Sequence, residues 1–200
     1  MLNLVIFGPP GCGKGTQSLR IARRYGLVHL SSGEIFRNEI RSNTLLGDKV
    51  RDVMNKGLLI PDNIVLKRLY KAASRFINTP GIIFDGFPRT LFQAQMLDRL
   101  LNKKCIPLNL AIFMLVDKDE LMARLVGRSE DSGRMDDCRE VIDRRMAVYE
   151  EETKPLREYY IRQRKILQVS GMAPVDEVSA KIARAIDFYI EKDEIIPEVI

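Results

Sequence analysis

A glycine-rich loop between an apolar segment and a helical segment is the feature of this sequence that most limits its fold. Residues 8–16 read GPPGCGKGT, residues 2–7 before them are nearly all apolar, and residues 13–25 have helical periodicity. A strand–loop–helix unit of this kind is typical of a phosphate-binding loop, because several backbone N–H groups converge on one anion beside a helix N-terminus. Gly15 stands where Ser or Thr usually follows the lysine, so the sequence leaves open whether Thr16 bonds magnesium directly.

Short apolar runs alternate with helical segments along the rest of the chain. The expected strands are residues 2–7, 27–30, 81–85, 110–116 and 166–170. The expected helices are residues 13–25, 33–41, 46–56, 62–76, 92–102, 118–126, 139–163 and 175–191. The strand segments are almost continuously apolar, which is typical of strands covered on both faces. The sequence therefore predicts an α/β domain with a parallel sheet flanked by helices.

Two connections are longer than a simple crossover needs. Residues 31–80 join the second and third expected strands and predict a small helical subdomain beside the sheet. Residues 127–137, GRSEDSGRMDD, are polar and contain glycine, which is typical of a mobile loop. Because long loops in compact domains are often functional lids, we expect this one to close over a bound ligand.

Composition narrows the class of protein further. The 200 residues are 46% hydrophobic and 30% charged, and no apolar run approaches the roughly 18 residues that a membrane span needs. The N-terminus lacks a basic region and a cleavage site, so we expect a cytoplasmic protein without a signal peptide. The three cysteines form no CxxC pair, which predicts neither a zinc site nor a disulfide framework.

The net charge of +5 suits an anionic partner, either a small polyanion or a nucleic acid. Aromatic residues are only 7% of the chain, and no stretch interleaves them with basic residues to stack bases. We therefore expect a small-molecule partner, with no nucleic acid and no membrane, and a monomeric protein.

Five motifs, taken together, resemble a known family. They are residues 8–16, LSSGEIFR at 30–37, GLLIP at 57–61, DGFPRT at 85–90 and GRMDD at 133–137. Their order and sequence resemble the nucleoside monophosphate kinases, and most closely the adenylate kinases, over about residues 1–171. The resemblance implies a P-loop kinase fold with a five-stranded parallel sheet of order 2-3-1-4-5. It also implies a core of residues 1–30, 61–126 and 138–200, an NMP-binding insert of residues 31–60 and a short lid of residues 127–137.

The activity implied by the resemblance is reversible, Mg²⁺-dependent transfer of the terminal phosphoryl group of ATP to AMP, giving two ADP. On the donor side it implies ATP contacts from the following residues: Gly11, Cys12, Gly13, Lys14, Gly15, Thr16, Arg124, Arg128, Gly171 and Ala173. Phosphoryl transfer requires positioning and positive charge rather than covalent catalysis. The residues expected to supply that charge are Lys14, Arg89, Arg128, Arg134 and Arg145. Arg144 matches a basic family position without a clear role, and Asp136 and Asp137 match an acidic pair that orients arginines.

On the acceptor side, the resemblance implies AMP contacts from these residues: Ser32, Arg37, Leu58, Leu59, Ile60, Gly86, Phe87, Pro88, Arg89, Gln93, Arg134 and Arg145. Either Ser31 or Ser32 can also cap the helix that follows. The carboxamide of Gln93 has both a donor and an acceptor, as the N1/N6 edge of adenine requires. From position alone, Gln93 could equally be an exposed helix residue, and Leu58, Leu59 and Ile60 could belong to the core of the subdomain.

Asp85 is the residue expected to hold Mg²⁺. It ends an apolar strand segment and resembles a Walker-B aspartate, which holds the metal through water. No structural zinc is expected, because the short lid lacks the ligands that longer lids carry. His29, the only histidine, and Cys12 are interpreted as structural residues. The alternative function is a UMP/CMP kinase, whose lid is similarly short; Ser32, commonly alanine in those enzymes, and Gln93 argue against it.

Overall fold

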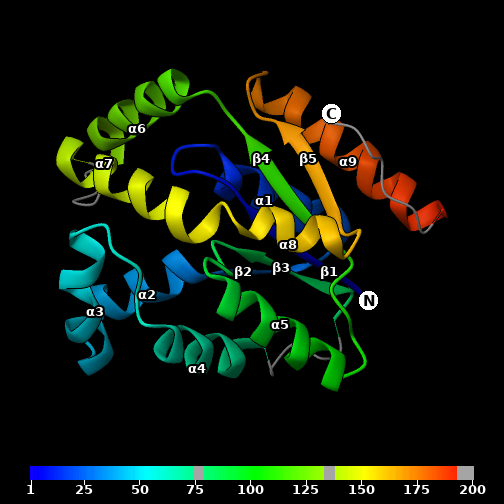
Figure 1. Ribbon diagram of the computed structural model, residues 1–200, viewed down its shortest axis with the longest axis horizontal. Coiled ribbons are helices and arrows are strands. Elements are labelled where there is room, and N and C mark those ends of the chain that lie inside the picture. Colours follow the sequence, from blue (N-terminus) through cyan, green and yellow to red (C-terminus); the bar gives the residue numbers. More distant parts are fainter. Residues whose placement is uncertain (74–78, 133–137, 193–200) are drawn as a thin grey trace.

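A computed structural model describes residues 1–73, 79–132 and 138–192 (Figure 1). Its centre is a parallel sheet with the strand order β2-β3-β1-β4-β5, as the resemblance implied. The strands are β1 (Leu2–Phe7), β2 (Val28–Ser31), β3 (Gly81–Asp85), β4 (Leu110–Leu115) and β5 (Ile166–Ser170). Each lies within a residue of its predicted bounds.

Helices cover both faces of the sheet, which explains why its strands are apolar throughout. Alternate residues of β1 point to opposite faces: Leu4 and Ile6 pack in one core cluster, and Val5 and Phe7 in the other. The helices of the first cluster are α1 (Lys14–Tyr25), α6 (Lys118–Ser132) and α9 (Val175–Lys192). Those of the second are α4 (Asp62–Ala73), α5 (Leu91–Lys103) and α8 (Leu156–Arg162).

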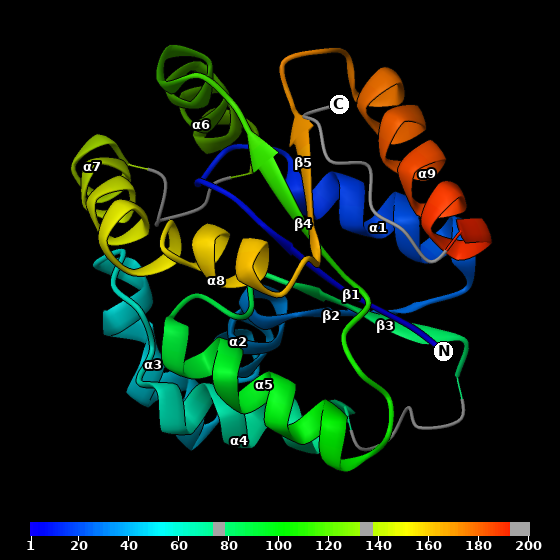
Figure 2. The same ribbon diagram turned by 45° about the vertical axis from the view of Figure 1, so that its right-hand side comes forward.

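The predicted helical subdomain forms beyond β2. Its first two helices, α2 (Ser32–Arg41) and α3 (Leu45–Asn55), pack against each other. Thr44 caps α3 by accepting a hydrogen bond from the backbone N–H of Gly47, which explains the break between these helices. Both views show α3 on the same side of the molecule as α6 and α7 (Arg139–Val148) (Figures 1 and 2).

The single helix predicted for residues 139–163 was wrong. The chain forms α7, a π-helix (Tyr149–Thr153) and then α8. Pro155 lies between the last two elements and has no backbone N–H to continue an α-helix. The backbone N–H of Lys154 instead donates to the Tyr149 carbonyl, at 2.8 Å, which is the wider spacing of a π-helix.

The helix before the predicted polar loop extends further than expected. α6 continues to Ser132, so residues 127–132 are helical. This segment contains one glycine and no proline, and one interior glycine costs a helix only about 1 kcal/mol. Arg134, Asp136 and Asp137 lie outside the described residues, as does the tail from residue 193. Among the residues that are described, no helix is long and apolar enough to cross a membrane.

Candidate functional site

The loop between β1 and α1 has a backbone conformation that glycine adopts most readily. Gly11 and Gly13 have φ angles of 84° and 88°, in the left-handed region. Gly13 is the N-cap of α1 and has no side chain to accept from it, so the first N–H groups of the helix can point to a ligand. A Cβ atom on Gly11 would lie 2.9 Å from Leu125 Cγ. α6 therefore supports the loop from outside, and the loop can bind an anion at the helix N-terminus.

Lys14 is the positive charge of this loop. Its Nζ donates to the carbonyl oxygen of Pro9 at 3.2 Å, so the side chain folds back over the loop. Burial lowers the pKa of Lys14, and the neighbouring Cys12 and Asp85 offset part of that decrease. Cys12 itself is fully buried, in agreement with its interpretation as a structural residue. A phosphate group here would add the negative charge that favours the protonated lysine.

Asp85 ends β3 next to the phosphate loop. Its Oδ2 lies 3.3 Å from His29 Nε2, and the same nitrogen lies 3.0 Å from Ser18 Oγ in α1. Burial of Asp85 acts to raise its pKa, but the hydrogen bond from His29 and the charge of Lys14 outweigh burial and lower it. The Asp85 carboxylate is therefore favoured in its ionised form, and the hydrogen bond from His29 orients it.

The start of α2 lies against the turn that follows β3. Ser31 is the N-cap, since its Oγ accepts from the backbone N–H of Glu34, and Ser32 Oγ donates to the Gly86 carbonyl at 2.6 Å. Ser31 is thus the residue that caps the helix, whereas Ser32 bonds to the turn after β3. A Cβ atom on Gly33 would lie 3.0 Å from the Arg37 guanidinium, so Arg37 folds over the N-terminus of its own helix.

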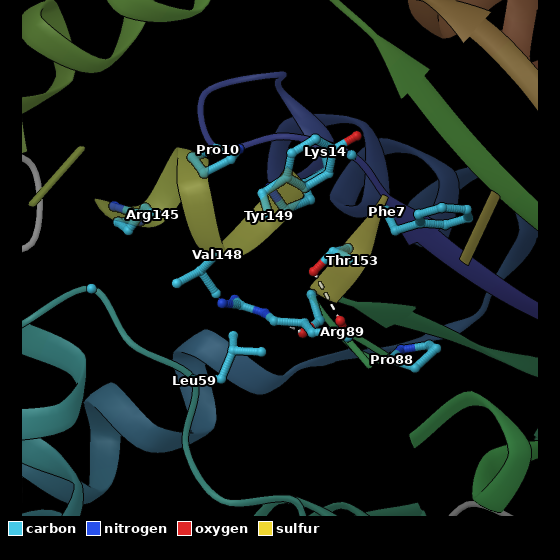
Figure 3. Close-up of a pocket in the computed structure, with 13 residues that line it drawn as sticks. Phe7, Pro10, Lys14, Leu59, Pro88, Arg89, Arg145, Val148, Tyr149 and Thr153 are labelled. Carbon is cyan, nitrogen blue, oxygen red and sulfur yellow. Dashed lines mark hydrogen bonds between the residues drawn. The ribbon is translucent and has the colours of Figure 1, made fainter. Parts of the chain in front are cut away.

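Arg89 is held at three points, by Gly86, Gln93 and Thr153. Its Nε donates to the Gly86 carbonyl at 2.8 Å, and its backbone N–H donates to Gln93 Oε1 at 2.8 Å. Its own carbonyl accepts from Thr153 Oγ1 in the π-helix, at 2.9 Å. Figure 3 shows Thr153 directed at the Arg89 backbone, while the Arg89 side chain extends between Leu59 and Val148. The π-helix therefore contributes a hydrogen bond to the Arg89 backbone, which the sequence did not indicate.

Gln93 lines a mostly apolar pocket and is only 2% exposed, so it is not an exposed helix residue. The pocket is lined by Ser32, Gly33, Phe36, Met54, Leu58, Leu59, Ile60, Val65, Gly86, Arg89 and Gln93. Its lining is mostly apolar, with polar side chains from Ser32, Arg89 and Gln93, and such a pocket suits a nucleobase. Phe87, a predicted AMP contact, is not among the residues that line this pocket. Its side chain is fully buried, and its ring centroid lies 6.3 Å from that of Phe84.

A second cavity joins the phosphate loop to cationic side chains from distant parts of the chain. It contains every residue predicted for the ATP side, together with Arg37, Asp85, Gly86, Arg89 and Arg145. Arg124 is fixed at its wall, donating to Glu120 Oε1 at 2.7 Å and to the Gly171 carbonyl at 2.9 Å. Arg144 is directed elsewhere, to the Lys56 carbonyl at 3.1 Å. Gly86 and Arg89 line both this cavity and the apolar pocket.

Two residues of the site were missed from the sequence. Thr153 was hidden in the predicted long helix, although Pro155 signalled a break there. Asp62 follows Pro61 and opens α4, and its Oδ1 accepts from Gln93 Nε2 at 2.6 Å. The Pro-Asp pair predicts a helix start, but nothing in the sequence indicates a partner 31 residues away.

This geometry defines a class. A P-loop at the carboxyl ends of a parallel sheet, opposite a base-sized pocket and joined to it by an arginine-lined cavity, is the site of a P-loop nucleotide kinase. The comparisons with known proteins name the family within that class. The family sequence profile that matches residues 6–165 is described as adenylate kinase, and this chain belongs to that family.

Named relatives agree with this assignment. The chain is 42% identical to an adenylate kinase of Bacteroides thetaiotaomicron, over 94% of this chain and 99% of that protein. It is 43% identical to an adenylate kinase of Maricaulis maris, over 93% and 99%, and 40% identical to one of Porphyromonas gingivalis, over 94% and 96%. The resemblance drawn from the sequence motifs is confirmed, and the UMP/CMP kinase alternative is not favoured.

Proposed function

We propose that this protein catalyses the reversible, Mg²⁺-dependent transfer of the terminal phosphoryl group of ATP to AMP, giving two ADP. The observation that carries the proposal is that Gly86 and Arg89 line both the phosphate-loop cavity and the apolar pocket. A donor triphosphate in the first and an acceptor base in the second would meet at Arg89. Family membership and relatives named adenylate kinase support the same reaction.

On the donor side, the backbone N–H groups of residues 11–16 would hold the ATP phosphates, with Lys14 at the β- and γ-phosphates. Arg124 would stack on the adenine, beside Gly171 and Ala173. Arg124 is already held by Glu120 and the Gly171 carbonyl, so its guanidinium plane has little freedom left to lose on binding.

On the acceptor side, Arg37 would bind the AMP phosphate and Ser32 would contact the nucleotide at the start of α2. Residues 58–60 and the turn at residues 86–88 would enclose the base and ribose. Gln93 would hydrogen-bond to the N1/N6 edge of adenine, because it is a buried carboxamide that lines the apolar pocket and has both a donor and an acceptor.

The chemical step requires the protein to orient the reacting groups and to supply positive charge. Arg89 would bridge the acceptor phosphate and the transferred phosphoryl group, while Arg128, Arg134 and Arg145 would compensate the charge on its equatorial oxygens. Arg89 is pre-positioned by Gly86, Gln93 and Thr153. Such preorganisation lowers the barrier because little reorganisation remains at the moment of transfer.

The residues near the loop suit Mg²⁺. Asp85 is an ionised carboxylate, and its Oδ2 would lie 3.7 Å from a Cβ atom on Gly15, so it faces the start of α1. Mg²⁺ prefers oxygen ligands and keeps several waters, so Asp85 would hold it through water, with Thr16 nearby. When bound, Mg²⁺ neutralises phosphate charge. Within the described part of the chain no three His, Cys, Asp or Glu side chains cluster around a possible metal; the lack of a structural zinc stays a prediction.

The domain division proposed here is a core of residues 1–30, 61–126 and 138–200, an acceptor-binding insert of residues 31–60 and a lid of residues 127–137. Closure of the lid and insert would exclude water that could otherwise hydrolyse ATP, and we expect this motion to limit turnover. We further propose a cytoplasmic monomer that binds neither nucleic acid nor membrane.

The test is a coupled assay of the purified protein with MgATP and, in turn, AMP, UMP, CMP and GMP. AMP should be the preferred acceptor and ADP the product. Preference for UMP or CMP would replace the proposal with the pyrimidine kinase alternative, and absence of any diphosphate product would overturn it.

A further inference from the structure

Gln93 is held in one amide orientation by two partners of opposite character. At one end, its Oε1 accepts from the backbone N–H of Arg89 at 2.8 Å, and at the other its Nε2 donates to Asp62 Oδ1 at 2.6 Å. A backbone N–H can only donate and an ionised carboxylate can only accept. Rotating the amide by 180° would set oxygen against carboxylate and NH₂ against N–H. The partners themselves therefore fix which end of Gln93 carries the oxygen.

The two hydrogen bonds that hold Gln93 leave it with a defined set of unused donors and acceptors. A carboxamide has two N–H donors and two lone pairs on oxygen, and one of each is used in these two bonds. One N–H and one lone pair remain, and Gln93 lines the apolar pocket. A 6-aminopurine offers an acceptor at N1 and a donor at the 6-amino group. A 6-oxopurine offers the opposite order, a donor at N1 and an acceptor at O6.

A freely rotating glutamine could serve either base by turning over, whereas a locked glutamine can serve only one. We propose that Asp62 is a specificity-determining, positioning residue: by fixing the amide of Gln93, it makes the acceptor pocket favour a 6-aminopurine monophosphate over a 6-oxopurine monophosphate. This rests on the proposed function, which places the acceptor base in this pocket. Asp62 acts through Gln93 and needs no contact with the nucleotide.

Asp62 also makes a second, structural contact, and the experiment has to distinguish its effect from that of the hydrogen bond to Gln93. Its Oδ2 accepts from Thr90 Oγ1 at 3.1 Å, and the same Oγ1 caps α5 by accepting from the Gln93 backbone N–H at 3.2 Å. Asp62 thus ties the first turn of α4 to the N-terminus of α5. Thr90→Val removes that tie and the cap but leaves the bond from Asp62 Oδ1 to Gln93, so it is the matched control for structural damage.

The experiment compares the wild type with Asp62→Ala, Asp62→Asn and Thr90→Val. The readout is the ratio of kcat/KM for AMP to that for IMP, measured with MgATP; circular dichroism and thermal unfolding follow the fold.

The wild type should strongly prefer AMP. Asp62→Ala should lower the ratio by about tenfold, the order of one hydrogen bond to a buried polar group. IMP should gain as AMP loses. Asp62→Asn can offer either oxygen or NH₂ to Gln93 and should lower the ratio by about threefold. Thr90→Val should keep the wild-type ratio although it is less stable.

Each outcome of this experiment either supports or overturns a stated proposal. A folded Asp62→Ala with the wild-type ratio, or a Thr90→Val that loses the ratio equally, overturns the proposed lock. If Asp62→Ala does not fold, an unchanged ratio in Asp62→Asn does the same. A wild type that uses IMP as well as AMP also overturns the inference while leaving phosphoryl transfer to a nucleoside monophosphate intact. A wild type that phosphorylates neither nucleotide contradicts the proposed function instead.

Discussion

The donor and acceptor halves of the site are built in different ways. The donor half is mostly backbone, made by the consecutive residues 8–16 where β1 ends and α1 begins. The acceptor half is mostly side chains, and its parts come from α2, residues 58–62, the turn at residues 86–93 and the π-helix. The donor half thus has one local motif at its centre, to which Arg124 and Gly171 are added from elsewhere in the chain. The acceptor half depends on the whole fold to bring its parts together.

The difference follows from what each half must recognise. Every nucleoside triphosphate presents the same phosphates, and backbone N–H groups at a helix N-terminus suffice for them. An acceptor base has to be told from similar bases, which requires polar groups of fixed direction. In the proposed site Gln93 would supply those, since its two ends are held by Asp62 and the Arg89 backbone. Specificity is therefore expected to depend on residues that touch no nucleotide.

The largest effect should come from the donor half. Replacing Lys14 by methionine removes the charge at the β- and γ-phosphates, so we expect kcat to fall by about 10³-fold or more, the scale of losing a key cation in phosphoryl transfer. Steady-state kinetics would measure the loss, and circular dichroism should show the wild-type fold. A variant within about tenfold of wild-type turnover would contradict the function assigned to Lys14.

Replacing Gln93 by leucine should separate the two halves most clearly. The variant loses the contact to the acceptor base and leaves Asp62 and the Arg89 N–H without their buried partner, so AMP affinity should fall by about 100-fold. ATP affinity should stay within about twofold, because the phosphate loop is unchanged. Calorimetric titration with each nucleotide measures both. Equal losses for AMP and ATP would mean that the two halves are not separable in this way.

A smaller effect is expected where the π-helix supports the acceptor half. Thr153→Val keeps the shape of the side chain but removes the donor to the Arg89 carbonyl. We expect kcat to fall about tenfold, since small displacements of a positioning group cost this much. Thr153→Ser keeps the hydroxyl and should retain most activity, which makes it the matched control. If valine and serine variants behave alike, the hydrogen bond from Thr153 does not position Arg89.

The same contrast explains which features the sequence could predict. The phosphate loop and all five strands were recognisable, because each depends on neighbouring residues: glycines at residues 11 and 13 allow the left-handed turns, and continuous apolar runs signal strands buried on both faces. Base-reading Gln93 could be proposed through family resemblance. Its buried setting could not, because Asp62 reaches it only after α4 and α5 have packed at their N-termini.

The errors in the predicted helices have a similar cause. Periodicity continues across residues 139–163, so it cannot show that the backbone widens to a π-helix before Pro155. The loop predicted at residue 127 was placed by polar composition, but a polar segment without proline can extend a helix already begun, as α6 does to Ser132. Contact between Thr153 and Arg89 joins residues 64 positions apart, and no local pattern reports it.

The smallest effect should come from a contact that belongs to neither half. Tyr25, at the end of α1, donates to Asp187 Oδ1 of α9 at 2.6 Å. Burial and this hydrogen bond raise the pKa of Tyr25 to about 12, so the neutral phenol is favoured in the folded state. Its stabilising effect is complete below the unfolded-state pKa of about 10 and is lost as the pH rises through 12. Tyr25→Phe should therefore lower the free energy of unfolding by about 1 kcal/mol at pH 8.

Because its effect on stability depends on pH in a known way, Tyr25→Phe is a control for the variants of the donor and acceptor halves. The gap in unfolding free energy between wild type and Tyr25→Phe should stay constant up to about pH 10 and shrink between pH 10 and 12, as urea titrations at each pH would show. At pH 8 the variant should match the wild type in kcat, in AMP affinity and in ATP affinity, because both halves of the site are intact. A loss in nucleotide affinity from this distant change would show that global stability, rather than local geometry, separates the donor and acceptor variants.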